Sequence, residues 1–311
     1  MVNTRNALRS LRRDLKRDWQ MYLFLIVPII YLIIFAYVPI GGMQIAFRKY
    51  SARLGMWGSK WVGLANFEKF INSYYFSTVI KNTLVLSFYS IVFTFPLPII
   101  MALMMNCIRN TRYRNIAQTI TTLPHFISVV VLVGIMFQLF NPHYGFYGVV
   151  YKSLTGTLPA DLFANPNTFS HFYIWSGVWQ QFGWNSIIYI AALSAVDPSL
   201  HEAAVVEGAS RFQRVLTIDL PTILPTIITM LILRMGSVMS IGFEKVFLLQ
   251  NDVNLSNSEV ISTYVYKMGL GSSKTDFSYA TAVDLFNSII NLVLIAATNA
   301  VSRKVSQNSL W

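Results

Sequence analysis

The side chains that could carry out catalysis are present in this chain, but they do not occur in catalytic patterns. No Gly-x-Ser-x-Gly elbow and no phosphate-binding loop ending in Gly-Lys-Ser/Thr is found. Cys107 is the single cysteine, which excludes an internal disulfide and a cysteine-based metal site. The histidines make no zinc-ligand pair and lie apart at His125, His143, His171 and His201. We therefore expect a chain that is not an enzyme and binds no metal and no cofactor of its own.

Two charged residues lie inside long apolar runs, where charge is costly. Arg234 and Asp284 approach the middle of their runs from opposite ends, so a rise of about 1.5 Å per residue brings them to a similar depth. An unpaired arginine at mid-bilayer costs on the order of 3 kcal/mol on insertion scales. Two interpretations stay open. Either the two residues face a translocation path, where they could pair, or they form a static salt bridge that fixes helix packing.

The fourth apolar run combines aromatic and amide side chains, including Trp184, Asn185 and Tyr189. Sugars stack on aromatic faces and form hydrogen bonds to amides and carboxylates. Aromatic residues also collect at membrane interfaces for reasons unrelated to a substrate, so packing remains the alternative. In the sixth run, Asn287 and Asn291 follow Asp284 at helical spacing and form a polar stripe that should face away from lipid. The residues predicted to line a substrate path are Trp184, Asn185, Tyr189, Arg234, Glu244, Asp284 and Asn287.

The composition is that of a membrane protein. Of 311 residues, 54% are hydrophobic and 12% are charged, whereas soluble domains carry about 25% charged residues. The formal net charge of +11 could suit nucleic acid, but the cations flank apolar runs, and this arrangement favours membrane orientation instead. The basic segment 1–18 is followed by an apolar run too long for a signal peptide. We expect an uncleaved anchor with a cytoplasmic N-terminus and no nucleic-acid partner.

Six apolar runs are long enough to cross a bilayer, which takes about 20 residues. They are continuously apolar, which predicts helices rather than a barrel. The predicted fold is an all-α membrane protein with six transmembrane helices, both termini cytoplasmic, and one membrane domain over 19–311. The runs lie near 20–46, 79–107, 116–140, 172–196, 222–249 and 278–302. The loop after the first run carries five cations yet must lie outside, which conflicts with the usual charge rule.

The polar segment 197–221 carries a spaced motif between two apolar runs. Asp197 can cap a helix that starts at Pro198. A left-handed turn at Gly208 and a second short helix from Ser210 would follow, giving a protruding helix–turn–helix with Arg211 as a charged anchor. The motif is EAA-x3-G-x9-I-x-LP, and its residues are Glu202, Ala203, Ala204, Gly208, Ile218, Leu220 and Pro221.

This motif resembles the cytoplasmic coupling loop by which permease subunits of ABC importers contact their ATPase partners. Over nearly its whole length the chain is similar to the binding-protein-dependent carbohydrate permeases of the maltose-importer class. The stretches 61–67, 123–128 and 242–249 agree as well, and the last two resemble a subset linked to complex oligosaccharides, including uronate-containing ones. The resemblance implies the type I importer permease fold and a location in the bacterial plasma membrane.

The resemblance also implies partners and site residues. These partners are a second permease, two ATPase subunits that hold ATP and Mg²⁺, and an extracytoplasmic sugar-binding protein. An oligosaccharide would enter the cytoplasm by alternating access. The coupling role carries over to Glu202, Ala203, Ala204, Gly208, Leu220 and Pro221, with Arg211 added as the anchor. The alternative is an ion-gradient-driven secondary transporter that uses Arg234 and Asp284, but it leaves segment 197–221 unexplained and lacks an inverted repeat.

Overall fold

The computed structural model describes residues 17–271 and 275–306, so residues 1–16 of the predicted basic segment lie outside the described residues. The first membrane helix is a continuous helical run that leaves the rest of the protein. It comprises α2 (Trp19–Leu32), the π-turn η1 (Ile33–Tyr37), α3 (Val38–Gly42) and the 3-10 turn η2 (Met43–Phe47). None of its apolar window is buried within this chain. Only its far end packs on the protein, where η2 contacts the last helix.

Four helical stretches are long and apolar enough to cross a membrane among the described residues, and a fifth results if one bent pair counts as a span. The four are 19–47, 76–106, 211–235 and 277–304. The second comprises α6 (Phe76–Thr94) and α7 (Pro96–Asn106), and the fourth is α18 (Phe277–Ser306). α11 (Phe169–Leu193) has the length of a span, but its amides lower its mean hydropathy, so it is not among the four. The predicted helical membrane fold is confirmed at this coarser level.

The third predicted span is bent rather than straight. α8 (Thr111–Thr122) and the 3-10 turn η3 (Leu123–Phe126) meet α9 (Val129–Leu139) at 96°. Pro124 lies in this elbow, and the Ser128 side chain caps α9 by accepting from Val131 N. The elbow exposes a backbone carbonyl, that of Ile127, to which the Gln180 amide donates at 2.7 Å. The bend is therefore satisfied by α11, as irregular backbone at membrane depth requires.

The fifth span differs from the predicted limits 222–249. It begins with α13 (Arg211–Arg214), continues through the π-turn η5 (Val215–Asp219) and ends with α14 (Leu220–Met235). The chain then turns irregularly through 236–242 before the separate helix α15 (Phe243–Leu249). Asn291 of α18 holds this turn by accepting from Met239 N at 3.0 Å and donating to Ser240 Oγ at 3.0 Å. The apolar run continued past Met235, so hydropathy alone did not reveal the break.

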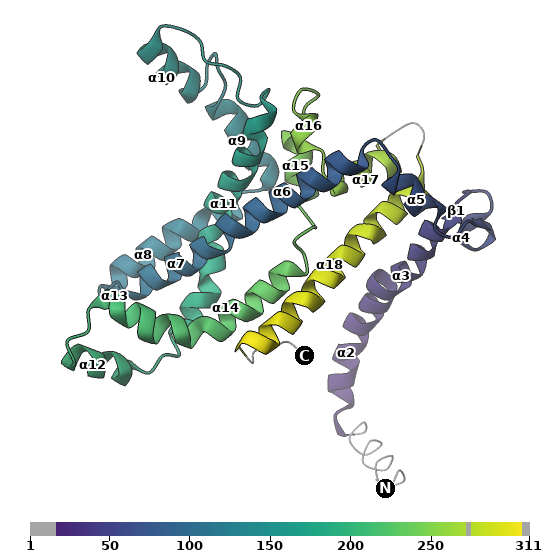
Figure 1. The fold of residues 1–311 in the computed structure, drawn as a ribbon. Helices are drawn as coiled ribbons and strands as arrows, with labels where there is room; N and C mark the ends of the chain where they lie inside the picture. Colours follow the sequence, from purple (N-terminus) through teal and green to yellow (C-terminus); the bar gives the residue numbers. More distant parts are fainter. Residues whose placement is uncertain (1–16, 272–274, 307–311) are drawn as a thin grey trace.

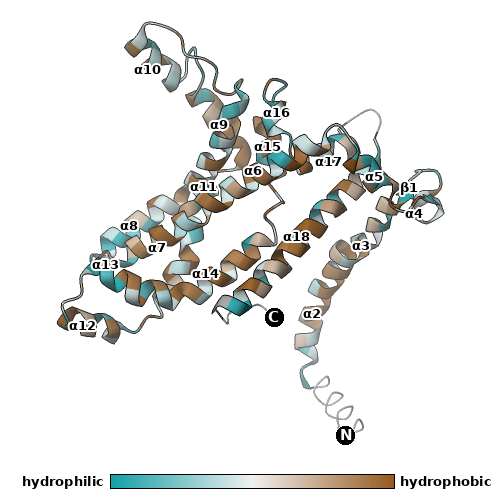
Figure 2. Cartoon of the chain, in the orientation of Figure 1, coloured by the Kyte–Doolittle hydropathy of each residue, from teal (hydrophilic) through white to brown (hydrophobic). Residues whose placement is uncertain are grey.

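Short helices and loops gather at one end of the molecule. They include β1 (Arg48–Lys49) paired antiparallel with β2 (Lys60–Trp61), and α10 (Phe146–Thr155) with the 3-10 turn η4 (Pro166–Thr168). The other elements at this end are α4 (Gly55–Gly58), α5 (Ala65–Ile71), α16 (Leu255–Ser258) and α17 (Ile261–Gly269). At the opposite end lie α12 (Pro198–Val206), the start of α2 and the end of α18 (Figure 1). Figure 2 shows hydrophilic residues at both ends and brown apolar helices between them.

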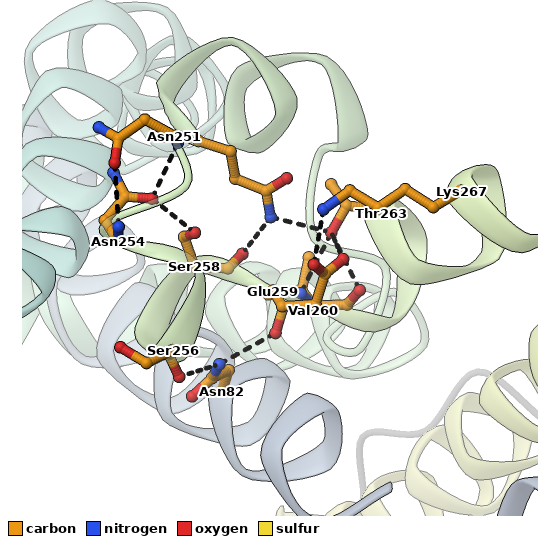
Figure 3. A network of polar contacts seen from close by, with 10 residues as sticks. Asn82, Asn251, Asn254, Ser256, Ser258, Glu259, Val260, Thr263 and Lys267 are labelled. Carbon is orange, nitrogen blue, oxygen red and sulfur yellow. Dashed lines mark hydrogen bonds and ion pairs between the residues drawn. The ribbon is translucent and has the colours of Figure 1, made fainter. Parts of the chain in front are cut away.

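A network of buried polar contacts ties this outer end to the membrane helices (Figure 3). Asn82 of α6 donates to the carbonyls of Ser256 and Glu259, each at 3.0 Å. Glu259 also pairs with Lys267 at 2.6 Å, while the buried Asn254 donates to Leu249 O at 3.0 Å. Buried polar groups with several partners fix one arrangement of the backbone. The segment from α15 to α17 is thus a rigid cap on α6.

Two cations of the loop after the first helix, Arg48 and Lys69, have local partners. The Arg48 guanidinium donates to Trp57 O and Ser59 O at 2.9 and 2.8 Å and lies over the Trp61 ring. Lys69 pairs with Asp276 at 2.8 Å. These contacts hold both charged side chains against the protein.

Candidate functional site: a membrane cavity and a protruding loop

A cavity of about 870 Å³ lies beside α11 in the middle of the protein. α6, α7, α9, α14 and α15 complete its wall, so six helices from different parts of the sequence meet there. Five of the predicted path residues line this cavity, and they are Trp184, Asn185, Tyr189, Arg234 and Glu244. A cavity of this volume with aromatic and polar lining is suited to binding an organic ligand.

Two basic side chains lie on this wall. Arg234, in the last turn of α14, donates from Nη2 to Ser90 Oγ of α6 at 3.0 Å. Lys245 of α15 is 8% exposed, donates to Tyr173 O at 2.9 Å and lies 5.1 Å from the centroid of the Tyr173 ring. Lys245 was not among the predicted path residues, although its neighbour Glu244 was. The irregular turn 236–242 is what brings α15, with Glu244 and Lys245, back to the cavity.

The two remaining predicted path residues lie elsewhere. Asp284 and Asn287 are on α18 and are not among the residues that line the cavity. Asn287 is buried, and its Oδ1 has no hydrogen-bond partner among the described residues. Among the described residues no ion pair joins Asp284 to Arg234, whose guanidinium bonds to Ser90 instead. A role of Asp284 and Asn287 in the path stays a prediction.

The wall around Trp184 is organised by the elbow of the bent span. The His125 ring, in η3, stacks on the indole of Trp184 with centroids 4.1 Å apart and planes 6° from parallel. His125 Nδ1 also lies 2.9 Å from Gln181 Oε1. The elbow therefore lies directly behind two side chains of the cavity wall.

The segment 197–221 forms the expected capped helix at the opposite end from the outer cap. The Asp197 carboxylate accepts from Ser199 N at 2.9 Å and caps α12, which starts at Pro198. The hydrogen bonds from the Ser199 backbone and hydroxyl lower the pKa of Asp197 below its usual value. Sequence reasoning anticipated this cap correctly.

A turn and a second cap complete the loop. Gly208 has φ of 81°, a left-handed conformation that favours glycine. Ser210 and Gln213 then form a reciprocal capping box, with Ser210 N donating to Gln213 Oε1 at 2.7 Å. Where a short separate helix was expected, α13 continues without a break into α14. Leu220 and Pro221 thus lie inside one continuous helix rather than at the start of a new one.

The loop is anchored by a buried contact that sequence reasoning missed. Asp219, 2% exposed, accepts from His201 Nε2 at 3.1 Å and from Asn106 Nδ2 at 3.2 Å. These residues belong to η5, α12 and the end of α7, so one carboxylate joins three elements. The signal available was an acidic residue inside the motif and a histidine in its helix, but nothing in the spacing paired them.

The surface of the loop 197–221 is exposed and partly apolar. Glu202 and Ala203 are exposed, as are Gly208 and Arg211, whereas Ala204 is half-buried. Val206 is 88% exposed. Apolar side chains left exposed on a protruding, rigid element mark an interaction surface.

The sequence as a whole matches a known family. The model of the inner membrane component of binding-protein-dependent transport systems matches residues 94–307. The chain belongs to this family. It is a multi-pass permease subunit of an ABC importer, located in the inner membrane, as its apolar helices require. The predicted family and location are thereby confirmed.

Two curated relatives of the permease cover nearly its whole length. Protein LplB of Bacillus subtilis is 40% identical over 297 residues, which is 96% of this chain and 92% of that protein. The polygalacturonan/rhamnogalacturonan transport system permease protein YteP of the same organism is 37% identical over 291 residues, covering 94% and 90% of the two chains.

Two solved structures share the fold of the permease. One is a crystal structure of a bacterial ABC transporter involved in the import of the acidic polysaccharide alginate, with a TM-score of 0.85, 38% identity, and coverage of 96% and 99%. The other is a bacterial alginate ABC transporter in complex with an alginate pentasaccharide-bound periplasmic protein, with a TM-score of 0.86, 36% identity and the same coverage. The similarity extends over the whole membrane fold.

Proposed function

We propose that this permease moves an acidic, uronate-containing oligosaccharide into the cytoplasm through the cavity beside α11. The observation that carries the proposal is the chemistry of the wall. Arg234 and Lys245 supply two basic side chains, whereas Glu244 is the acidic residue among the described lining residues. Trp184 offers an aromatic ring and Asn185 an amide. Carboxylates pair with cations, and sugar rings stack on aromatic faces, so the wall suits an acidic sugar better than a neutral one.

The relatives support the same substrate class. YteP is named for polygalacturonan and rhamnogalacturonan, and the two solved transporters for alginate. All three names denote polymers that contain uronic acids. The cavity of about 870 Å³ is large enough to enclose a few sugar rings rather than a long polymer.

The proposed assembly follows from surfaces that this chain leaves uncovered. The loop 197–221 would insert into an ATPase subunit, with Glu202, Ala203, Ala204, Gly208 and Arg211 at the contact and Leu220 and Pro221 at its base. Two such ATPases would hold ATP and Mg²⁺. A second permease would cover the exposed first helix, and an extracytoplasmic binding protein would deliver the sugar to the outer cap. In this proposal the chain crosses the membrane six times with both termini in the cytoplasm. The sugar crosses by alternating access.

The geometry does not favour the alternative of an ion-driven transporter. That mechanism used Arg234 and Asp284 as a proton relay, which requires contact or a bridging group. Arg234 bonds to Ser90, and Asp284 does not line the cavity. The long anchored loop would also have no role in such a protein.

The test is ATPase activity of the complete complex in lipid, with loaded binding protein and with either uronate or neutral oligosaccharides. We expect uronate oligosaccharides to stimulate hydrolysis, and the double variant Glu202→Lys, Gly208→Pro to abolish stimulation while the complex still assembles. Stimulation by neutral sugars alone would contradict the substrate class. Unchanged stimulation in the double variant would show that the loop is only a connector.

A further inference from the structure

The elbow between α8 and α9 contacts the cavity wall from behind, and one of its side chains touches two lining residues. His125 stacks on Trp184 and hydrogen-bonds to Gln181, and both partners line the cavity. His125 itself is half-buried and is not among the lining residues. An imidazole outside the cavity thus touches two neighbouring groups that a ligand would meet.

The first consequence concerns the indole of Trp184. His125 covers one of its faces, and the ring of Phe126 meets it edge-on with centroids 6.0 Å apart. The side chain nevertheless remains 42% exposed. Because a rotation about its side-chain bonds would break both ring contacts, the indole is held in one orientation at the cavity wall. A flat aromatic face in a fixed orientation is a stacking surface for a sugar ring.

The second consequence concerns the amide of Gln181. Its Oε1 accepts from His125 Nδ1, so the amide nitrogen, with two N–H donors, is left for the cavity. Gln180 is fixed in turn, since it donates to Ile127 O at 2.7 Å. Free N–H donors match carboxylate and hydroxyl oxygens of a uronate. The elbow therefore sets both a stacking face and a donor on the same stretch of α11.

We propose that His125 is a positioning residue that presents Trp184 and Gln181 to a uronate ring and thereby sets the substrate preference of the permease. The inference rests on the proposed transport function and deepens it. His125 acts through its two neighbours and does not touch the sugar. The imidazole ring stacks on the indole of Trp184, and its Nδ1–H donates to the side-chain amide of Gln181 and fixes its orientation.

The variants separate these two contacts. His125→Phe keeps a ring against Trp184 but loses the hydrogen bond to Gln181, whereas His125→Ala loses both. The matched control is His143→Ala, an exposed histidine outside the cavity. Gln181→Met and Trp184→Phe remove the two presented groups without changing the elbow.

The first readout is the ratio of uronate-stimulated to neutral-sugar-stimulated ATPase activity in the complete complex. We expect His125→Phe and Gln181→Met to lower this ratio about tenfold, the effect of one charge-assisted hydrogen bond, with little change in the concentration of binding protein at half-maximal rate. His125→Ala should also lower the maximal rate, as Trp184→Phe does. The His143→Ala control should match the wild type.

The second readout needs no sugar and so separates this inference from the proposed function. It is the fluorescence emission of Trp184, taken as the difference between each chain and its Trp184→Phe counterpart in lipid. A stacked imidazole quenches an indole, so we expect a small difference in the wild type and a larger one in His125→Ala. Equal emission, or an unchanged sugar ratio in His125→Phe and Gln181→Met, would overturn the inference. Absence of any sugar stimulation in the wild type would instead contradict the transport proposal.

Discussion

Arg234 and Lys245 are held in the cavity wall by different means. Arg234 is exposed and bonds to a single hydroxyl, so it can move toward a ligand. Lys245 is buried against Tyr173 and is fixed. One basic side chain is therefore adaptable and the other is preorganised, and the preorganised one loses less conformational freedom when a carboxylate binds.

At the residue scale we predict that neutralising either cation weakens the response to uronate sugars selectively. Arg234→Gln and Lys245→Gln should each lower uronate-stimulated ATPase activity about tenfold, because a hydrogen bond to a charged group contributes about 1.5–3 kcal/mol. The matched control, Glu244→Gln, removes a negative charge from the wall and should leave the uronate response equal or higher. Equal losses with neutral sugars would contradict the charge argument.

The individual side chains were only partly predictable from the sequence. Trp184, Asn185 and Tyr189 share one helix, and they were predicted from their aromatic and amide side chains. Glu244 was predicted but its neighbour Lys245 was not, and the irregular turn 236–242 that brings both to the cavity depends on Asn291 of the distant α18. The anchor of the loop, Asp219 with His201, depends likewise on a tertiary contact.

At the scale of elements, the cap of α12 should respond to pH in a defined direction. The pKa of Asp197 is lowered in the fold, so its stabilising contribution is complete above the unfolded value of about 3.9 and is lost as the pH falls through the folded value. We expect amide exchange in Pro198–Val206 to accelerate in that acidic range, after correction for intrinsic rates.

Two substitutions separate the cap from its charge. Asn caps helices as well as Asp does, so Asp197→Asn should keep α12 protected and remove the acid-dependent acceleration. Asp197→Ala should accelerate exchange severalfold at neutral pH. An identical acid response in wild type and Asp197→Asn would show that another group controls the loop.

The crossing of α11 over α8 should be sensitive to the smallest added side chain. A Cβ at Gly183 would overlap the carbonyl group of Thr121. We predict that Gly183→Ala destabilises the protein by about 1–3 kcal/mol, as overpacking does, measured by thermal unfolding in detergent. Gly134→Ala on α9 is the control, since nothing lies within 4 Å of its added Cβ. Its effect should be neutral or a gain of up to about 1 kcal/mol.

The existence of most long helices was predictable from apolar length, but their shape was not. The elbow at Pro124 lies within the run 116–140 that was predicted as one span, and the partner that satisfies it, Gln180, is on α11. A proline alone is compatible with a slight kink or a sharp break. Only the packing of α11 decides between them.

At the scale of the whole molecule, the single cysteine provides a test of orientation. Cys107 lines a small pocket of about 230 Å³ beside His201 and Asp219, at the base of the loop 197–221. A small membrane-impermeant methanethiosulfonate should modify it in inside-out vesicles and not in right-side-out vesicles. The reciprocal variant, Cys107→Ser with Ser153→Cys on the exposed face of α10, should show the opposite pattern. Modification from the same side in both would contradict the proposed topology.

The continuous helix Arg211–Met235 has a mechanical consequence. It spans 25 residues, or roughly 36 Å at about 1.5 Å per residue. One end belongs to the protruding loop, and the other carries Arg234 at the cavity wall. A tilt of about 5° at the loop end would sweep the far end through about 3 Å over that length, comparable to the diameter of a water molecule. The helix would work as a lever, and a small movement at the loop would suffice to bring its arginine within reach of a sugar or withdraw it.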